Sequence, residues 1–215
     1  MTWVKFCGIK TIDDANNVAM CRADAIGFVV GISPYEPCED ERRLERSKNI
    51  IENFKHDIER IAVTRVKDIV SLFSIIETLN VDSVQLFHNF SSEELDKIYS
   101  EFPKIKIIKT ICVKDNSAIE LAEKYELLVD RILLDSCGDL GRGGTGNVHN
   151  WSISKMVVSS VRTPVILAGG LNPSNISDAI SIVKPWGVDM DSGVTTDGKK
   201  NVEKMKLIMG ACKNK

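Results

Sequence analysis

The sequence lacks the features that would assign it to a membrane, to a secretory route or to a nucleic acid. No apolar run reaches the ~18 residues that a membrane-spanning helix needs. The opening residues, MTWVKFCGIK, have no basic stretch followed by a long apolar core, so we expect no secretory signal and a cytoplasmic location. The formal net charge is only −2, which offers no electrostatic footprint for nucleic acid or for an anionic membrane surface.

The sequence also lacks any C-x-x-C pair among its six cysteines, which argues against a structural zinc site. In a reducing cytoplasm we expect these thiols to be free rather than disulfide-bonded. Cys7, Cys38, Cys112, Cys137 and His88 nevertheless all fall at or after expected strand ends. Because thiolate and imidazole groups bind soft metals, a metal site is one open alternative, although the irregular spacing argues against it.

Short apolar runs alternate with longer amphipathic segments along the whole chain. The runs are rich in β-branched residues and have the length of strands. The expected strands are WVKF, AIGFVV, RIAVT, SVQLF, KIIKTI, RILL, PVILA and GVDM. The segments between them have helical spacing; in residues 67–80, for example, Ile69, Leu72, Phe73 and Ile76 share one face.

Several helix ends are marked in the sequence. The helical segment 11–23 starts with Thr11 as its N-cap and has acids in its first turn. The segment 91–102 opens with serines and acids, and in the segment 172–184 we expect Pro173 in the first helical turn. The charge runs EDERRLER and DGKKNVEKMK are typical of solvated helix faces.

Strict alternation of eight strands with eight helices predicts parallel pairing and closure into a (β/α)8 TIM barrel, an α/β fold. A flavodoxin-like sheet would need about five strands. The 215 residues fit one such barrel as a single domain, residues 1–215, with little room for insertions.

In such barrels the chemistry lies where strands end and the following loops begin. Cys7 ends the first expected strand, Gln85 lies near the end of the fourth, and Asp135 ends the sixth. Asp189 lies within the eighth. Taken alone, a cysteine at the position of Cys7 is more often a small buried core residue than a reactive thiol. A carboxylate that closes an apolar strand, as Asp135 does, is harder to explain structurally.

Glycine-bearing loops, LAGGLNPSN and DMDSGV, follow the last two expected strands. Loops at these two places often bind phosphate, because glycine lets backbone N–H groups approach an anion. The candidate phosphate contacts here are Gly169, Gly170, Ser192 and Gly193. The alternative for the glycine pair is a simple tight turn. Asp191 would repel a phosphate unless it caps a helix and faces away.

The stretch DSCGDLGRGGTGNVHNW, after the sixth expected strand, is long and dense in glycine. Long loops in compact domains are often functional, and a mobile loop beside an active site can act as a lid. Arg142 is a candidate contact for an anionic ligand, and Gly144 is a further candidate for phosphate. The alternative is a plain flexible connection.

Six segments occur in order along nearly the whole chain: KFCGIKTIDDA, DAIGFVVGISP, VDSVQLF, LLDS with GGTGNVHNW, PVILAGGLNPSNISDAI and WGVDMDSGV. Together they resemble the phosphoribosylanthranilate isomerase family of (β/α)8 barrels. The resemblance implies an Amadori rearrangement in tryptophan biosynthesis, from N-(5-phosphoribosyl)anthranilate to 1-(2-carboxyphenylamino)-1-deoxyribulose 5-phosphate. It implies that Cys7 is the general base, that Asp135 is the general acid and that Asp189 lines the substrate. It also implies a small phosphorylated substrate, no metal or cofactor, and a monomer or homodimer.

The chain departs from this family where the substrate is recognised. The family usually has an arginine directly after the Ser-Pro of the second strand, on the anthranilate side, whereas this chain has Tyr35. A phenol cannot replace a guanidinium that pairs with a carboxylate without loss. If the activity is kept, Arg142 is the candidate for the replacement cation, and Tyr35 and Gln85 are further candidates for substrate contact. Two other functions stay open. One is a divergent enzyme for another phosphorylated sugar or aminosugar; the other is a barrel that binds a phosphorylated ligand without turnover.

Overall fold

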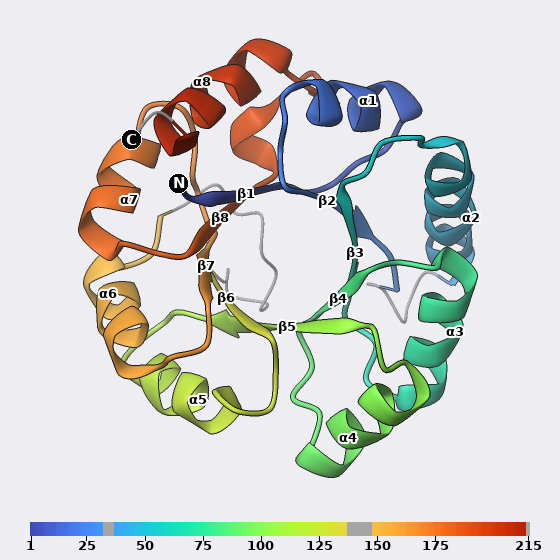
Figure 1. Ribbon diagram of the computed structural model, residues 1–215, viewed down its shortest axis with the longest axis horizontal. Helices are drawn as coiled ribbons and strands as arrows, with labels where there is room; N and C mark the ends of the chain where they lie inside the picture. The colour runs from blue at the N-terminus through green and yellow to red at the C-terminus, as the bar shows by residue number, and fades with distance from the viewer. Residues whose placement is uncertain (32–36, 137–147, 214–215) are drawn as a thin grey trace.

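The computed structural model describes residues 1–31, 37–136 and 148–213. Eight parallel strands form a closed barrel in which each strand pairs with the next and β8 pairs with β1. Figure 1 looks along this barrel and shows the strands as an inner ring with the helices around it. The predicted TIM barrel is therefore confirmed. Among the described residues, no helix has both the length and the apolar character to span a membrane.

The eight strands coincide with the predicted segments. They are β1 (Trp3–Phe6), β2 (Ala25–Val29), β3 (Glu59–Thr64), β4 (Ser83–Leu86), β5 (Lys106–Cys112), β6 (Arg131–Asp135), β7 (Val165–Leu167) and β8 (Gly187–Met190). The helices are α1 (Ile12–Met20), α2 (Pro37–Asn53), α3 (Ile69–Leu79), α4 (Ser92–Glu101), α5 (Ser117–Tyr125), α6 (Trp151–Ser160), α7 (Ile176–Val183) and α8 (Val202–Lys213). Between β8 and α8 lie a 3₁₀ turn, η1 (Ser192–Val194), and a short hairpin, β9 (Thr195–Thr196) with β10 (Lys199–Lys200).

Two of the predicted helix starts are confirmed by their capping bonds. The Thr11 hydroxyl accepts a hydrogen bond from the backbone N–H of Asp14 at 3.0 Å. At α4, Ser91 and Glu94 form a reciprocal capping box, which satisfies two backbone donors at the helix start. These local bonds depend only on residues three apart, so the sequence alone could reveal them.

The start of α7 differs from the prediction. Pro173 lies before the helix, which begins at Ile176. The Asn172 side chain accepts a hydrogen bond from the backbone N–H of Ser174, and the Asn175 side chain accepts one from the N–H of Asn172. The two asparagines therefore hold this stretch as a turn, and the helix starts three residues beyond the proline.

Side chains of each strand alternate between two packed regions. One face of β1 contributes Val4 and Phe6 to the large core between strands and helices. The other face points Lys5 and Cys7 into the barrel, where Cys7 belongs to a smaller apolar cluster. The members of this interior cluster are Cys7, Ala25, Ile61, Val63, Ile108, Leu133, Ile166 and Ala168.

The N-terminal end of the barrel is closed by a charged and aromatic cluster. The rings of Trp3 and Trp186 stack with centroids 5.2 Å apart, and the Arg131 guanidinium lies 5.0 Å from each centroid. Arg131 also donates to both carboxylate oxygens of Glu59, at 2.8 and 2.9 Å. Because this cluster lies opposite the carboxyl ends of the strands, we assign it to stability rather than to chemistry.

We predict that Glu59→Gln destabilises the barrel through the unpaired Arg131 charge. The two side chains are only 13% and 10% exposed, and breaking such a buried pair costs about 3 kcal/mol or more. Urea unfolding measures this loss. The control is Glu203→Gln, whose pair with Lys206 is solvent-exposed and should contribute little to stability, because water screens the two charges. Equal losses in the two variants would contradict the assignment.

Candidate active site

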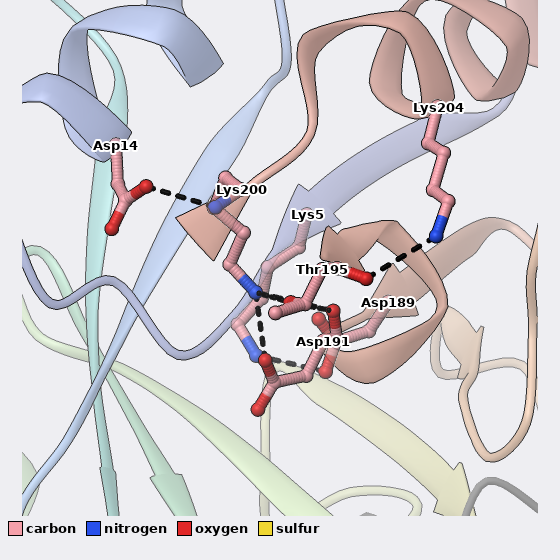
Figure 2. Close-up of polar contacts among 7 residues, drawn as sticks. All are labelled: Lys5, Asp14, Asp189, Asp191, Thr195, Lys200 and Lys204. Carbon is pink, nitrogen blue, oxygen red and sulfur yellow. Dashed lines mark hydrogen bonds and ion pairs between the residues drawn. The ribbon is translucent and has the colours of Figure 1, made fainter. Parts of the chain in front are cut away.

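A lysine ammonium lies at the centre of the barrel. Lys5 of β1 is fully buried, and its Nζ donates to Gln85 Oε1 of β4 at 2.7 Å and to Asp189 Oδ2 of β8 at 2.9 Å. Figure 2 shows the Lys5–Asp189 ion pair beneath the loop that follows β8. Burial acts to lower the pKa of Lys5, but the charges and hydrogen bonds of Asp189 and Cys7 together outweigh burial, and the pKa is raised. Lys5 therefore stays charged.

Cys7 lies two residues beyond Lys5 on the same inward face of the chain. A Cβ at Gly27, on β2, would come within 2.9 Å of the Cys7 Sγ atom, so a glycine is needed there to make room for the thiol. Cys7 is only 7% exposed, and burial raises its pKa to about 12 against the opposing charge of Lys5. Desolvation thus outweighs the nearby cation, and the thiol of Cys7 is held in its neutral form.

Asp135 ends β6 and is only 9% exposed to solvent. Burial, and then the charge of Asp189, raise its pKa to about 6, while Lys5 and Arg65 act in the opposite direction. A carboxyl with this pKa keeps part of its proton near neutral pH, as a general acid requires.

The barrel thus brings together Cys7, Gln85, Asp135 and Asp189. The charge of Asp189 acts on the pKa of both Cys7 and Asp135, which places all three within electrostatic reach of one another. The Asp189 Oδ1 atom is buried and has no hydrogen-bond partner among the described residues. That oxygen is available to a ligand, since buried polar atoms are otherwise almost always paired.

The loops after β7 and β8 pack closely on one another. Gly169 and Gly170 have φ values of 81° and 67°, in the left-handed region that favours glycine. A Cβ at Gly193 would lie 1.9 Å from the carbonyl oxygen of Leu171, so only glycine fits between the two loops. Within the described residues, no hydrogen bond uses the backbone N–H of Gly169 or Gly170. Both N–H groups can therefore donate to an anion.

Asp191, which follows β8, has a neutralising partner. The Lys200 Nζ atom, from β10, donates to Asp191 Oδ1 at 2.7 Å and to Thr195 Oγ1 at 3.0 Å. Figure 2 shows Lys200 reaching these oxygens while its backbone N–H donates to Asp14. The side chain of Asp191 makes no capping bond to η1. Asp191 therefore does not escape the repulsion by capping a helix; an ion pair with Lys200 offsets its charge instead.

Three candidates for substrate or phosphate contact, Tyr35, Arg142 and Gly144, lie outside the described residues, as does Cys137. Cys7, Cys21, Cys38 and Cys212 are free thiols, as expected. Cys112 is disulfide-bonded, so the expectation of free thiols is wrong there. A reducing compartment predicts that most cysteines are free, but it does not predict the state of any one cysteine. Disulfide formation depends on which cysteines the fold brings together.

Within the described ranges, no group of three or more histidine, cysteine or acidic side chains could hold a metal ion. Cys38 is exposed on α2, whereas Cys7 is buried inside the barrel. The described members of the proposed soft-metal cluster are thus not gathered around one point.

Sequence reasoning missed three cations of this face: Lys5, Lys200 and Arg65. Lys5 could have been found, because a lysine two residues before Cys7 on a strand must share its inward face. Arg65 directly follows β3, and that position alone marks it as a residue of the catalytic end. Nothing local marks Lys200, whose role depends on the unpredicted hairpin.

Comparisons with known proteins agree with the geometry. The family model for N-(5'-phosphoribosyl)anthranilate (PRA) isomerase matches residues 4–211. The protein of Methanosarcina mazei named N-(5'-phosphoribosyl)anthranilate isomerase 2 is 38% identical over 208 residues, which cover 95% of this chain and 90% of that relative. The crystal structure of phosphoribosyl anthranilate isomerase from Thermotoga maritima superposes with a TM-score of 0.83 at 29% identity, and covers 100% of both chains.

A further similar structure contains a bound ligand. It is described as phosphoribosyl anthranilate isomerase in complex with reduced 1-(o-carboxyphenylamino)-1-deoxyribulose 5-phosphate. Its TM-score is 0.80 at 27% identity, and the match covers 100% of both chains.

We predict that Asp135→Asn makes the protein more stable at pH 8 but not at pH 4. The folded-state pKa of about 6 lies above the unfolded value of ~3.9, so wild-type stability falls as pH rises through this interval. The loss amounts to about 3 kcal/mol, and an asparagine avoids it. Urea unfolding at both pH values measures the difference, with Asp96→Asn, an exposed position on α4, as the control. An Asp135→Asn variant no more stable than wild type at pH 8 would refute the assigned environment.

Proposed function

This chain belongs to the N-(5'-phosphoribosyl)anthranilate isomerase family, and we propose that Cys7 and Asp135 are the general base and the general acid of its reaction. The enzyme converts N-(5-phosphoribosyl)anthranilate to 1-(2-carboxyphenylamino)-1-deoxyribulose 5-phosphate, a step of tryptophan biosynthesis. The observation that carries the two roles is the site itself. A carboxyl with a pKa of about 6 and a thiol beside a buried lysine share one barrel mouth.

The first step is opening of the ribose ring. Asp135 donates its proton to the ring oxygen, the bond between that oxygen and C1 breaks, and the nitrogen lone pair forms a cationic Schiff base at C1. The carboxylate left on Asp135 is stabilised by the positive charges of Lys5 and Arg65, both of which lower its pKa.

The second step is proton removal from C2. The Cys7 thiolate takes this proton, the C–H electron pair forms the C1–C2 double bond, and the nitrogen regains its lone pair. The resulting enaminol loses its hydroxyl proton and gains one at C1, which gives the ketone. Burial keeps the Cys7 thiol protonated in the free enzyme. At this step the positive charges of Lys5 and of the Schiff base both favour the thiolate.

The remaining polar groups suit binding of the sugar phosphate. We assign the phosphate to the backbone N–H groups of Gly169, Gly170, Ser192 and Gly193, where the loops after β7 and β8 meet. The unpartnered Asp189 Oδ1 atom suits a ribose hydroxyl, because a carboxylate oxygen accepts the hydrogen bond that a hydroxyl donates. Gln85 acts through Lys5, whose ammonium it helps to fix.

We predict that Cys7→Ala and Asp135→Asn each lower kcat by about 10²–10⁴-fold, the usual contribution of a general base or acid. The assay follows loss of anthranilate fluorescence from freshly generated phosphoribosylanthranilate. Cys7→Ser tests the chemistry at nearly constant shape, and it too should be impaired because a hydroxyl ionises far less readily than a thiol. Wild-type turnover by a folded Cys7→Ala protein would exclude Cys7 as the base.

A fourth prediction concerns the charge on Asp191. Lys200→Met leaves this carboxylate uncompensated beside the assigned phosphate, so the affinity for the reduced product analogue should fall about tenfold or more. Isothermal titration calorimetry measures the affinity. The double variant Asp191→Asn/Lys200→Met removes the repulsion and should recover most of the loss. If the single and double variants bind alike, the Asp191 charge does not act on the phosphate.

A further inference from the structure

The substrate of the proposed function carries a benzene ring with a carboxylate beside the reacting nitrogen. Selective binding of that group needs a cation next to an apolar surface, and a guanidinium suits it best because it can pair with a carboxylate through two bonds. The family usually supplies an arginine where this chain has Tyr35. Another position must then supply the cation.

Arg65 stands in the right part of the fold for this task. It directly follows β3, so it lies at the same end of the barrel as Cys7 and Asp135. Its backbone N–H donates to the carbonyl oxygen of Gly31 at 3.1 Å, which places it beside the residue that lies two positions after β2. Its guanidinium also acts on the Asp135 carboxyl.

An open pocket of about 310 Å³ adjoins Arg65. The described residues that line it are Arg65, Lys67, Phe87, His88 and Asn89. The guanidinium carbon of Arg65 lies 4.5 Å from the centroid of the Phe87 ring, and Phe87 packs against the interior cluster that contains Cys7. The lining thus combines cations with an aromatic surface, next to the reacting groups, and none of these residues is acidic. An aromatic carboxylate is the ligand chemistry that this combination favours.

The aromatic surface of this pocket, the Phe87 ring, is held in place by Lys109 of β5. Lys109 is 2% exposed, and its ammonium donates to the carbonyl oxygens of Phe87 and Thr110, each at 2.8 Å. These bonds fix the backbone of Phe87 between β4 and α4, so the ring needs little ordering when a ligand binds.

We propose that Arg65 binds the carboxylate of the anthranilate group, with the Phe87 ring against the anthranilate ring, and thereby determines substrate specificity. The proposal rests on the proposed function, since it takes a carboxyphenylamino sugar phosphate as the ligand. Lys67 lines the same pocket but is exposed, so its charge is more strongly screened by solvent. Arg65 is half-buried, so its charge is less screened, and we assign the carboxylate to Arg65 alone.

The test compares two inhibitors that differ only in the carboxylate. One is reduced 1-(2-carboxyphenylamino)-1-deoxyribulose 5-phosphate, and the other is its phenylamino counterpart. Calorimetry measures both dissociation constants for wild type, Arg65→Gln and the matched control Lys67→Gln. Wild type and the control should prefer the carboxylated inhibitor by about 30-fold or more, since truncating one member of a charge pair costs at least ~2 kcal/mol. Arg65→Gln should prefer it by less than about threefold.

A purely structural role for Arg65 predicts a different pattern: Arg65→Gln would weaken both inhibitors equally, and its thermal unfolding would shift. In turnover, loss of the carboxylate contact should raise KM, because this contact is the same in the ground state and the transition state. A fall in kcat is expected as well, since the Arg65 charge also stabilises the Asp135 carboxylate. Arg65→Lys should restore part of the preference, since a single ammonium replaces the fork of donors.

Two results would overturn the proposal. One is an Arg65→Gln protein that keeps the wild-type preference for the carboxylated inhibitor. The other is loss of the preference in Arg142→Gln but not in Arg65→Gln. Wild type that binds neither inhibitor would instead reject the proposed function, and the role of Arg65 with it. Because binding is measured without turnover, a defect in the catalytic pair alone leaves this test intact.

Discussion

The ion pair between Lys5 and Asp189 is the interaction on which the rest of the active site depends. It joins β1 to β8 at the point where the barrel closes, and Gln85 ties the same ammonium to β4 on the far side. Loss of either charge would leave the other buried and uncompensated, which is far more costly than loss of a surface pair. The pair also fixes the orientation of Asp189, because one carboxylate oxygen faces Lys5 and the other is left for a ligand.

Burial acts on the two reacting groups in one direction, toward their neutral forms. That direction suits Asp135 as the proposed acid, which must hold a proton, and opposes Cys7 as the proposed base, which must lose one. In the proposed mechanism, the permanent charge of Lys5 is the feature that would let the buried Cys7 thiol act as a base. The reaction itself contributes the second cation, so the thiolate is favoured mainly at the step that uses it.

The sequence revealed features that depend on neighbours along the chain. Strand periodicity, the Thr11 cap and the position of Asp135 at a strand end are local, and each agrees with the structure. Features that depend on distant neighbours were missed or misjudged. Lys5 acquires its partner 184 residues away, and Asp191 is neutralised by a hairpin with no strong strand pattern. The raised pKa of Cys7 follows from the burial of its side chain, which the sequence of a four-residue strand does not reveal.

The loss of an arginine at position 35 is compatible with an active isomerase because of how a barrel distributes its tasks. Cys7 and Asp135 extend directly from strand ends, where their positions are fixed by the hydrogen-bonded register of the whole sheet. The group that recognises the substrate's carboxylate need only reach it, and long side chains from several adjacent loops can do so. Since β2 and β3 are neighbours, a guanidinium at the end of either strand can reach the same part of the barrel mouth. Catalytic residues are thus constrained to one strand each, whereas a specificity residue can move to the next strand while the reaction stays the same.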